Sequence, residues 1–283
     1  MVREVREFLD PKPGGIYIDA TVGPGGHAEE ILKVISPGGR LIGVDRDEMA
    51  LKMAETRLSG KSVTLKKGNF SDMENLLSRE GISYVDSILF DLGVSMVQLK
   101  SPERGFSFTS DRRLDMRMDR EQEFSAWDVV NRYPEKEIEM ILKEYGEERL
   151  SKKIAQAIVR TRNKKPIDTC SELSRIVERV YGRRGRIHAA TRTFQALRIE
   201  VNRELEELRA GLDASLRLLK TGGRLCVISY HSLEDRMVKN FMNQSSKEGL
   251  LRVLTKKPVT PGHEELRLNP SSRSAKLRAA ERI

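Results

Sequence analysis

Short apolar runs alternate with segments of helical periodicity over residues 1–95, a pattern that few folds accommodate. We predict strands at residues 16–21, 40–45, 62–66 and 85–91, with helices between them near 27–35, 48–58 and 73–80. This alternation is typical of a parallel sheet with crossover helices. The chain is therefore expected to begin with an α/β unit.

The alternation stops after Ser95 and returns near Asn202. A long amphipathic helix is predicted at 203–219, with Thr221-Gly222-Gly223 as its stop signal. A strand at 224–229, a helix at 232–243 and strands at 250–254 and 275–280 complete the series. Four strands before the gap and three after it predict one seven-stranded Rossmann-like α/β domain, interrupted after its fourth strand by an all-helical domain. We place the parts at residues 1–108, 109–202 and 203–283.

Positive charge is concentrated in the second half of the insertion. The chain carries 51 Lys and Arg against 42 Asp and Glu, a net charge of +9, which favours an anionic partner. Residues 149–203 hold 15 basic and 4 acidic side chains, and Arg183, Arg184, Arg186 and Arg192 form the densest part. We predict that these arginines contact a phosphate backbone; a solvated basic face without a ligand is the alternative.

From the sequence we expect neither a targeting signal nor a membrane anchor. Its uninterrupted apolar stretches are a handful of residues long, so no transmembrane helix is expected. Met1–Asp10 mixes Arg and Glu and does not resemble a signal peptide, and we expect the chain in the cytosol. Cys170 and Cys226 match no metal or redox spacing and are predicted to be core residues, so no metal site is expected.

A glycine-rich loop joins the first predicted strand to the first helix. Gly23, Gly25 and Gly26 allow a tight turn and bring backbone N–H groups close to a ligand. Asp45 ends the second strand, where a carboxylate accepts hydrogen bonds from ribose hydroxyls. NAD, FAD and S-adenosylmethionine sites all use this combination. Asp19, at the end of the first strand, suits a methionine ammonium and suits a pyrophosphate badly, which favours S-adenosylmethionine.

Asp91 ends the fourth strand, at the edge where open α/β sheets bind ligands. Methyl transfer from a sulfonium depends mostly on positioning the nucleophile. If that nucleophile is the exocyclic amine of a base, an oxygen that accepts its N–H assists the reaction. Asp91 is our candidate for this acceptor, and the alternative is a turn or helix cap.

Six motifs in order resemble one known family. They are residues 19–27, 91–98, 104–108, 114–119, 193–202 and 228–236, which include Asp91-Leu92-Gly93-Val94-Ser95, Thr193-Phe194-Gln195-Ala196-Leu197-Arg198 and Ser229-Tyr230-His231-Ser232-Leu233-Glu234-Asp235-Arg236. The chain is similar over essentially its whole length to the MraW/RsmH type of bacterial S-adenosylmethionine-dependent methyltransferase. The resemblance implies a class I methyltransferase fold and methylation of the N4 amine of a cytosine in the decoding region of small-subunit (16S) ribosomal RNA.

The resemblance also implies a set of site residues. Those expected to bind the cofactor are Gly25, Gly26, His27, Asp45, Phe70, Asp91 and Gln98. Phe70 suits an apolar wall for adenine, although a plain core residue is the alternative. Gln98 has a surface polar residue as its alternative, and His27 an ordinary residue of the first helical turn.

The target cytosine must leave its stack to reach the methyl group. Residues 104–108 and Tyr230-His231 are candidates for a lid over it. His231 is a second candidate catalytic residue, through a hydrogen bond to the base, with a structural histidine as the alternative. The expected partner is small-subunit rRNA or the small subunit itself, and a homodimer stays open. Two rival functions are a non-catalytic ribosome-assembly factor and a nucleotide-dependent oxidoreductase.

Overall fold

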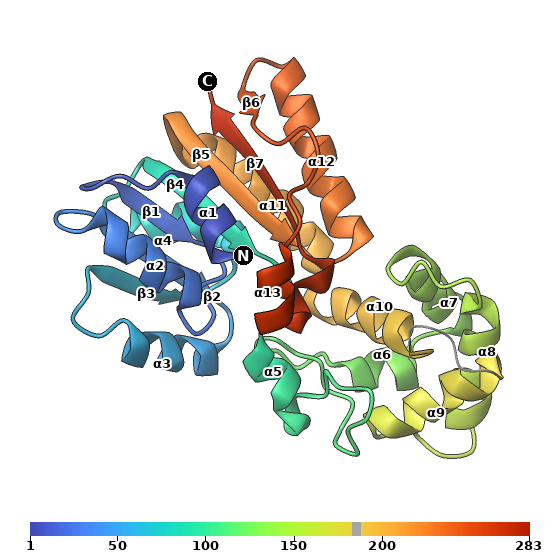
Figure 1. The fold of residues 1–283 in the computed structure, drawn as a ribbon. Coiled ribbons are helices and arrows are strands. Elements are labelled where there is room, and N and C mark those ends of the chain that lie inside the picture. The colour runs from blue at the N-terminus through green and yellow to red at the C-terminus, as the bar shows by residue number, and fades with distance from the viewer. Residues whose placement is uncertain (183–187) are drawn as a thin grey trace. The chain divides into compact units, whose positions relative to one another are not determined.

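The computed structural model describes residues 1–182 and 188–283, which form two compact units (Figure 1). The sheet unit comprises Met1–Gly93 and Leu205–Ile283, and the helical unit comprises Val94–Glu204. The chain therefore leaves the sheet unit after its fourth strand and returns to it for the last three. No helix in the described ranges is long and apolar enough to cross a membrane.

The sheet unit contains a seven-stranded sheet in the order β3-β2-β1-β4-β5-β7-β6, which confirms the predicted strand number. The strands are β1 (Ile16–Asp19), β2 (Arg40–Asp45), β3 (Val63–Lys67), β4 (Val85–Asp91), β5 (Leu219–Ser229), β6 (Leu251–Val253) and β7 (Lys276–Arg282). The first five run parallel, and β7 pairs antiparallel with both β5 and β6. The carboxyl ends of β2, β1, β4 and β5 thus meet along one edge.

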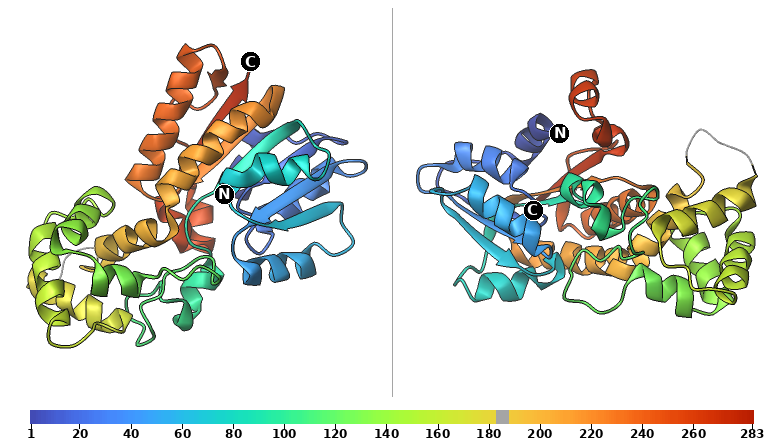
Figure 2. Two further views of the ribbon diagram at one scale, coloured as in Figure 1. Left: turned by 180° about the vertical axis from the view of Figure 1, so that it is seen from behind. Right: turned by 90° about the horizontal axis from the view of Figure 1, so that it is seen from below.

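Helices cover both faces of the sheet. On one face lie α1 (Val2–Leu9), α2 (Gly26–Ile35) and α3 (Glu48–Arg57), whose apolar side chains form one cluster with residues of the central strands. On the other face lie α4 (Met73–Ser78), α11 (Glu204–Leu218) and α12 (Ser232–Lys247), which form a second cluster. Figure 1 looks onto the first face, and the left view of Figure 2 shows α4 and α11 across the second.

One turn of the sheet unit differs from expectation. We expected Thr221-Gly222-Gly223 to end a helix, but the helix ends at Leu218 and the triplet lies inside β5, which starts at Leu219. Gly222 has a φ of 82°, and a Cβ on Gly223 would lie 2.9 Å from the carbonyl oxygen of Asp86. Gly222 therefore provides the left-handed backbone, and Gly223 permits a close approach to β4, where the register between the strands shifts.

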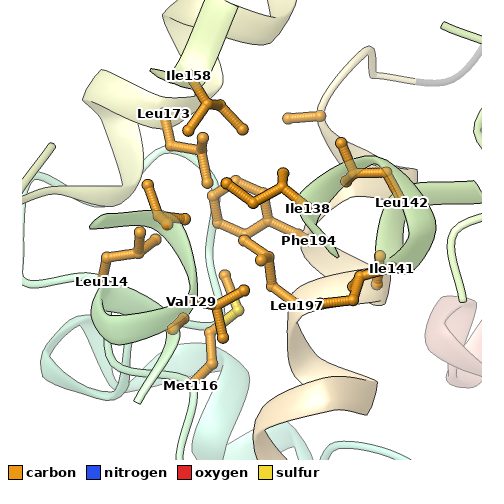
Figure 3. Packing of buried hydrophobic residues seen from close by; sticks show 14 of the residues in the cluster. Leu114, Met116, Val129, Ile138, Ile141, Leu142, Ile158, Leu173, Phe194 and Leu197 are labelled. Atoms are coloured by element: carbon orange, nitrogen blue, oxygen red, sulfur yellow. The ribbon is translucent and has the colours of Figure 1, made fainter. Parts of the chain in front are cut away.

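The described residues of the helical unit form helices and loops and contain no strand, apart from an isolated bridge between Arg113 and Thr169. Its helices are α5 (Met96–Lys100), η2 (Pro102–Arg104), α6 (Ala126–Arg132), α7 (Glu135–Glu144), α8 (Ser151–Arg162), α9 (Cys170–Tyr181) and α10 (Thr191–Asn202). Figure 3 shows Phe194 and Leu197 of α10 pointing toward Ile138, Ile141 and Ile158 from the helices around them.

The helical unit begins earlier than the boundary we expected after residue 108. Phe106 is buried in its core, and Gly105 passes so close to the following loop that a Cβ would lie 2.6 Å from the backbone nitrogen of Asp115. Arg104 is fully buried and donates to the carbonyl oxygens of Arg117 and Met118. Residues 94–108 therefore belong to the helical unit, and the segment 104–108 is held by its core.

Two short helices were not expected from the sequence. They are α1, which buries only Val5 and Leu9, and α13 (His263–Leu268), which buries none of its residues. The amino group of Met1 lies 3.1 Å from Oε1 of Glu265, so the two helices are joined by an ion pair.

Candidate functional site

Three carboxylates lie at the carboxyl ends of three neighbouring strands. Asp19 ends β1, Asp45 ends β2 and Asp91 ends β4, as predicted. Because these parallel strands are adjacent in the sheet, the three residues share one edge. Among the described residues, neither Asp19 nor Asp45 lies within ion-pair distance of a Lys or Arg. The edge therefore offers acceptors for a ligand that brings its own donors or positive charge.

The glycine loop connects β1 to α2 above this edge. The N–H of Gly23 donates to Oδ2 of Asp45 at 2.8 Å, so the loop is tied to the end of β2. Gly25 has a φ of 85°, and a Cβ there would lie 3.2 Å from Cδ1 of Leu58. Gly26 is the first residue of α2 and His27 the second, so their N–H groups belong to the helix start, where intrahelical acceptors are missing.

Asp45 is held in place by the backbone. Its Oδ1 accepts from the N–H of Asp47 at 2.9 Å, and its Oδ2 accepts from Gly23. Burial raises the pKa of Asp45, although these two hydrogen bonds act in the opposite direction. An ionised carboxylate has about four acceptor positions. Two positions thus stay available for hydroxyl donors such as those of a ribose.

Asp19 is the most deeply buried of the three acids, with 1% of its surface exposed. Burial raises its pKa to about 7; His27 lowers the pKa, and the charge of Asp91 raises it further. A buried carboxylate is poorly solvated, which disfavours its ionised form. A cation bound beside it would stabilise that form strongly.

Asp91 contacts three neighbouring residues, Thr21, Tyr230 and His27. Its N–H donates to Oγ1 of Thr21 at 2.6 Å, and the hydroxyl of Tyr230 donates to its Oδ1 at 2.9 Å. Nε2 of His27 lies 3.5 Å from its Oδ2. The Asp91 side chain still keeps 28% of its surface exposed, so it can reach a ligand.

His27 is partly buried beside two of these acids, with 16% of its side-chain surface exposed. Burial lowers its pKa, but the hydrogen bond and charge of Asp91 together with the charge of Asp19 outweigh that effect, and the net pKa is raised. Its Nδ1 is buried and has no hydrogen-bond partner among the described residues. The imidazole ring therefore lies beside the carboxylates of Asp91 and Asp19, and its predicted role toward the cofactor stays a prediction.

Tyr230 makes a contact with Asp91 that the sequence did not reveal. We considered it a lid residue, and that role stays a prediction. It follows β5 directly, and its hydroxyl reaches Asp91 at the end of the adjacent strand. Burial and the neighbouring Asp91 charge raise the pKa of Tyr230, so the phenol stays protonated and donates. The sequence feature that could have indicated this contact is an aromatic residue directly after the strand that neighbours β4.

His231 caps a helix. Its Nδ1 accepts from the N–H of Glu234 in the first turn of α12, and its Nε2 lies 3.1 Å from Oε1 of the same residue. The other oxygen of Glu234 accepts from the N–H of Tyr230 at 2.8 Å. This capping box supports the structural alternative for His231, and a contact with the target base stays a prediction.

Phe70 follows β3, in the short helix η1 (Phe70–Asp72). Its ring meets that of Phe90 edge to face, with centroids 5.4 Å apart, and a Cβ on Gly211 would lie 2.8 Å from its Cδ2. The ring thus packs partly on the core, and its contact with adenine stays a prediction.

Gln98 lies in α5 of the helical unit and is 5% exposed, so it is not a surface residue. Its Oε1 accepts from the N–H of Ser95 at 3.0 Å, and the Ser95 hydroxyl accepts in return from the N–H of Gln98. The side chain therefore completes a capping box. Its predicted role toward the cofactor is not tested by this geometry.

The predicted RNA-contacting arginines are only partly described. Arg183, Arg184 and Arg186 lie outside the described residues. Arg192 is exposed at the start of α10, where it donates to the carbonyl oxygen of Glu147 at 3.3 Å. Its guanidinium keeps donors available for a further partner.

Comparison with known proteins gives one consistent result. The model of the MraW methylase family matches residues 1–283. The chain is 53% identical over 287 residues to "Ribosomal RNA small subunit methyltransferase H" of Persephonella marina, covering 99% of this chain and 97% of the relative. It is 47% identical to the protein of the same name from Caldicellulosiruptor saccharolyticus, covering 100% and 98%.

The fold is also similar to a solved structure. A crystal structure of a proposed rRNA methylase from Clostridium thermocellum superposes with a TM-score of 0.50 at 14% sequence identity, covering 100% of this chain and 95% of that one.

Proposed function

The chain belongs to the MraW methylase family, and from this premise we propose that it transfers the methyl group of S-adenosylmethionine to the N4 amine of a cytosine in the decoding region of small-subunit ribosomal RNA. Membership of a methylase family argues against the oxidoreductase alternative. The rRNA substrate follows from the names of relatives that match almost end to end, and the N4 position follows from the motif resemblance.

The residues at the sheet edge fit S-adenosylmethionine. The main observation that supports the proposal is that the carboxylates of Asp19, Asp45 and Asp91 lie side by side without Lys or Arg partners among the described residues. Asp45 offers acceptors for the ribose hydroxyls. Buried Asp19 suits the ammonium of the methionine part, because a cation beside it would restore its ionised form. The N–H of Gly25 donates to the carbonyl oxygen of Val22 and shapes the turn, so the N–H groups offered to the ligand are those of Gly26 and His27 at the start of α2. Phe70 is the candidate wall for adenine.

When bound, S-adenosylmethionine supplies an electrophilic methyl group on a sulfonium. Asp91 then acts on the attacking amine: its oxygen accepts the amine N–H as positive charge develops on nitrogen. Tyr230 orients the Asp91 carboxylate through Oδ1. His27 lies on the side of Oδ2 and, with its raised pKa, stabilises the negative charge there.

The test is incorporation of labelled methyl groups from S-adenosylmethionine into small ribosomal subunits from cells that lack this activity, followed by nucleoside analysis. We expect N4-methylcytidine with the intact protein and none with Asp45→Ala. Naked rRNA is assayed in parallel to identify the form of the substrate. Tight cofactor binding without methyl transfer to either form would contradict the proposal and favour an assembly factor. Because the substrate is ribosomal, we expect the reaction in the cytoplasm.

A further inference from the structure

Helix α8 lies in a stretch of the helical unit that contains no acid. Residues 149–167 include seven Lys and Arg and no Asp or Glu. One face of α8 is buried in the unit's core through Ile154, Ala155 and Ile158, and Figure 3 shows Ile158 pointing into that core. The opposite face is turned to solvent.

Four cations occupy that solvent face, and we call them the basic stripe: Lys152, Lys153, Arg160 and Lys164. At 3.6 residues per turn they fall within an arc of about 120°. Lys164 follows the last residue of α8, but the turn continues through it, since its N–H donates to the carbonyl oxygen of Thr161 at 3.0 Å. The stripe extends along the helix by about 18 Å at 1.5 Å per residue.

Two neighbouring cations of the same segment, Arg162 and Lys165, have partners, whereas those of the stripe do not. Arg162 donates to the carbonyl oxygens of Val130 and Tyr133, and Lys165 pairs with Glu172 at 3.4 Å. No side chain of the stripe has a hydrogen bond or ion pair with any described residue. Arg160 and Lys164 even stand four residues apart, a spacing at which like charges destabilise a helix. Folding of the unit therefore does not account for this arrangement of charge.

We infer that the basic stripe binds the phosphate backbone of the substrate rRNA; the inference rests on the proposed function. A row of long, flexible cations without acids among them complements a linear polyanion. A membrane surface fits badly, because the apolar face that would enter the lipid is already buried in the protein core. All four residues of the stripe are described, and they lie in another part of the sequence than Arg183, Arg184 and Arg186.

The test is the salt dependence of binding to a transcribed fragment of small-subunit rRNA that contains the decoding region. The variant replaces all four residues of the stripe by Gln, which keeps length and helix propensity. If each cation contacts one phosphate of a single strand, the slope of log affinity against log salt should become shallower by up to about 3. Replacing Lys152, Lys153 and Lys164 by Arg should preserve the slope.

A matched control replaces four exposed cations of the sheet unit, Arg3, Arg6, Lys239 and Lys247, by Gln. We expect it to keep the wild-type slope, and we expect the stripe variant to keep the wild-type cofactor affinity and melting temperature. An unchanged slope in the stripe variant would overturn the inference, as would equal losses in both variants.

The remaining outcomes separate the inference from the proposed function. If the wild-type protein binds the rRNA but does not methylate it, the proposed function fails while the slope still tests the stripe. If the stripe variant binds naked rRNA normally and loses affinity only for assembled subunits, the partner is an acidic ribosomal protein, and the RNA inference is overturned. It is overturned too if the wild-type protein binds no rRNA.

Discussion

The hydroxyl of Tyr230 donates a hydrogen bond of 2.9 Å to Oδ1 of Asp91, from a position 139 residues further along the chain. Their strands, β4 and β5, are paired in the sheet, and Gly93, which lies two residues after Asp91, has a φ of 92°, a backbone conformation that favours glycine. The bond holds one carboxylate oxygen and leaves Asp91 partly exposed to a ligand.

Tyr230→Phe should slow methyl transfer without weakening cofactor binding. A hydrogen bond to a charged group contributes about 1.5–3 kcal/mol, and a partial loss of orientation corresponds to a fall in kcat of about tenfold. The measurement is single-turnover methyl transfer, with cofactor affinity by calorimetry as the control. A wild-type rate in the variant would show that Tyr230 does not position Asp91.

Asp19→Asn should change how stability depends on pH. The pKa of Asp19 is about 7 in the folded protein and 3.8 in its ordinary state, so between these values the folded state holds a proton that the unfolded chain has released. Raising the pH through this window therefore lowers the free energy of unfolding.

His27 acts in the same direction, because its raised pKa gives stability that is lost as the pH rises through the folded value. Chemical denaturation of cofactor-free protein at pH 5 and pH 8 should show a smaller loss of stability in Asp19→Asn than in wild type. Equal losses in the two proteins would contradict a buried, titrating Asp19. The variant should also bind S-adenosylmethionine more weakly.

Gly25→Ala should destabilise the glycine loop. A residue with a Cβ at a φ of 85° adopts the left-handed region at a cost of about 1–2 kcal/mol. The Cβ would also crowd Leu58. We expect a lower melting temperature and weaker cofactor binding, whereas Gly60→Ala, at a φ of 74° but with open space around it, serves as the control for strain alone. Identical effects on cofactor binding in both variants would argue against a special role for the loop.

Phe194→Ala should destabilise the helical unit. The ring is 5% exposed and meets Phe108 edge to face, with centroids 6.1 Å apart. Truncation of a buried Phe costs about 3–5 kcal/mol. Hydrogen exchange should show loss of protection over 94–204, with Leu268→Ala, a 74% exposed position, as the neutral comparison. Full protection in Phe194→Ala would mean that the core repacks around the cavity.

The sheet was predictable from the sequence because its signals are local. Residues 40–45 and 85–91 were predicted with the bounds that β2 and β4 have, since each is a short apolar run that ends in an acid. The same locality placed Asp19, Asp45 and Asp91 at one edge. Helix α1 was missed because its charged sequence buries only Val5 and Leu9.

What the sequence did not reveal depends on contacts between distant segments. Gly223 resembles a helix stop until the carbonyl of Asp86 on β4 is seen beside it. Arg104 resembles a surface cation, yet it is buried because carbonyl oxygens of a later loop accept its donors. No periodicity within a short window contains such partners, so these features required the structure.

The order of the strands has a consequence for biosynthesis. The helical unit is one continuous stretch, so all of its residues leave the translating ribosome before β5 is made. Until β5 has been synthesised, β4 is an unpaired edge strand of the partial sheet β3-β2-β1-β4. Unpaired edge strands favour aggregation. Because β7 lies between β5 and β6, the last residues of the chain complete the sheet. Loss of β7 alone would therefore leave both β5 and β6 with an exposed edge that β7 covers in the complete sheet.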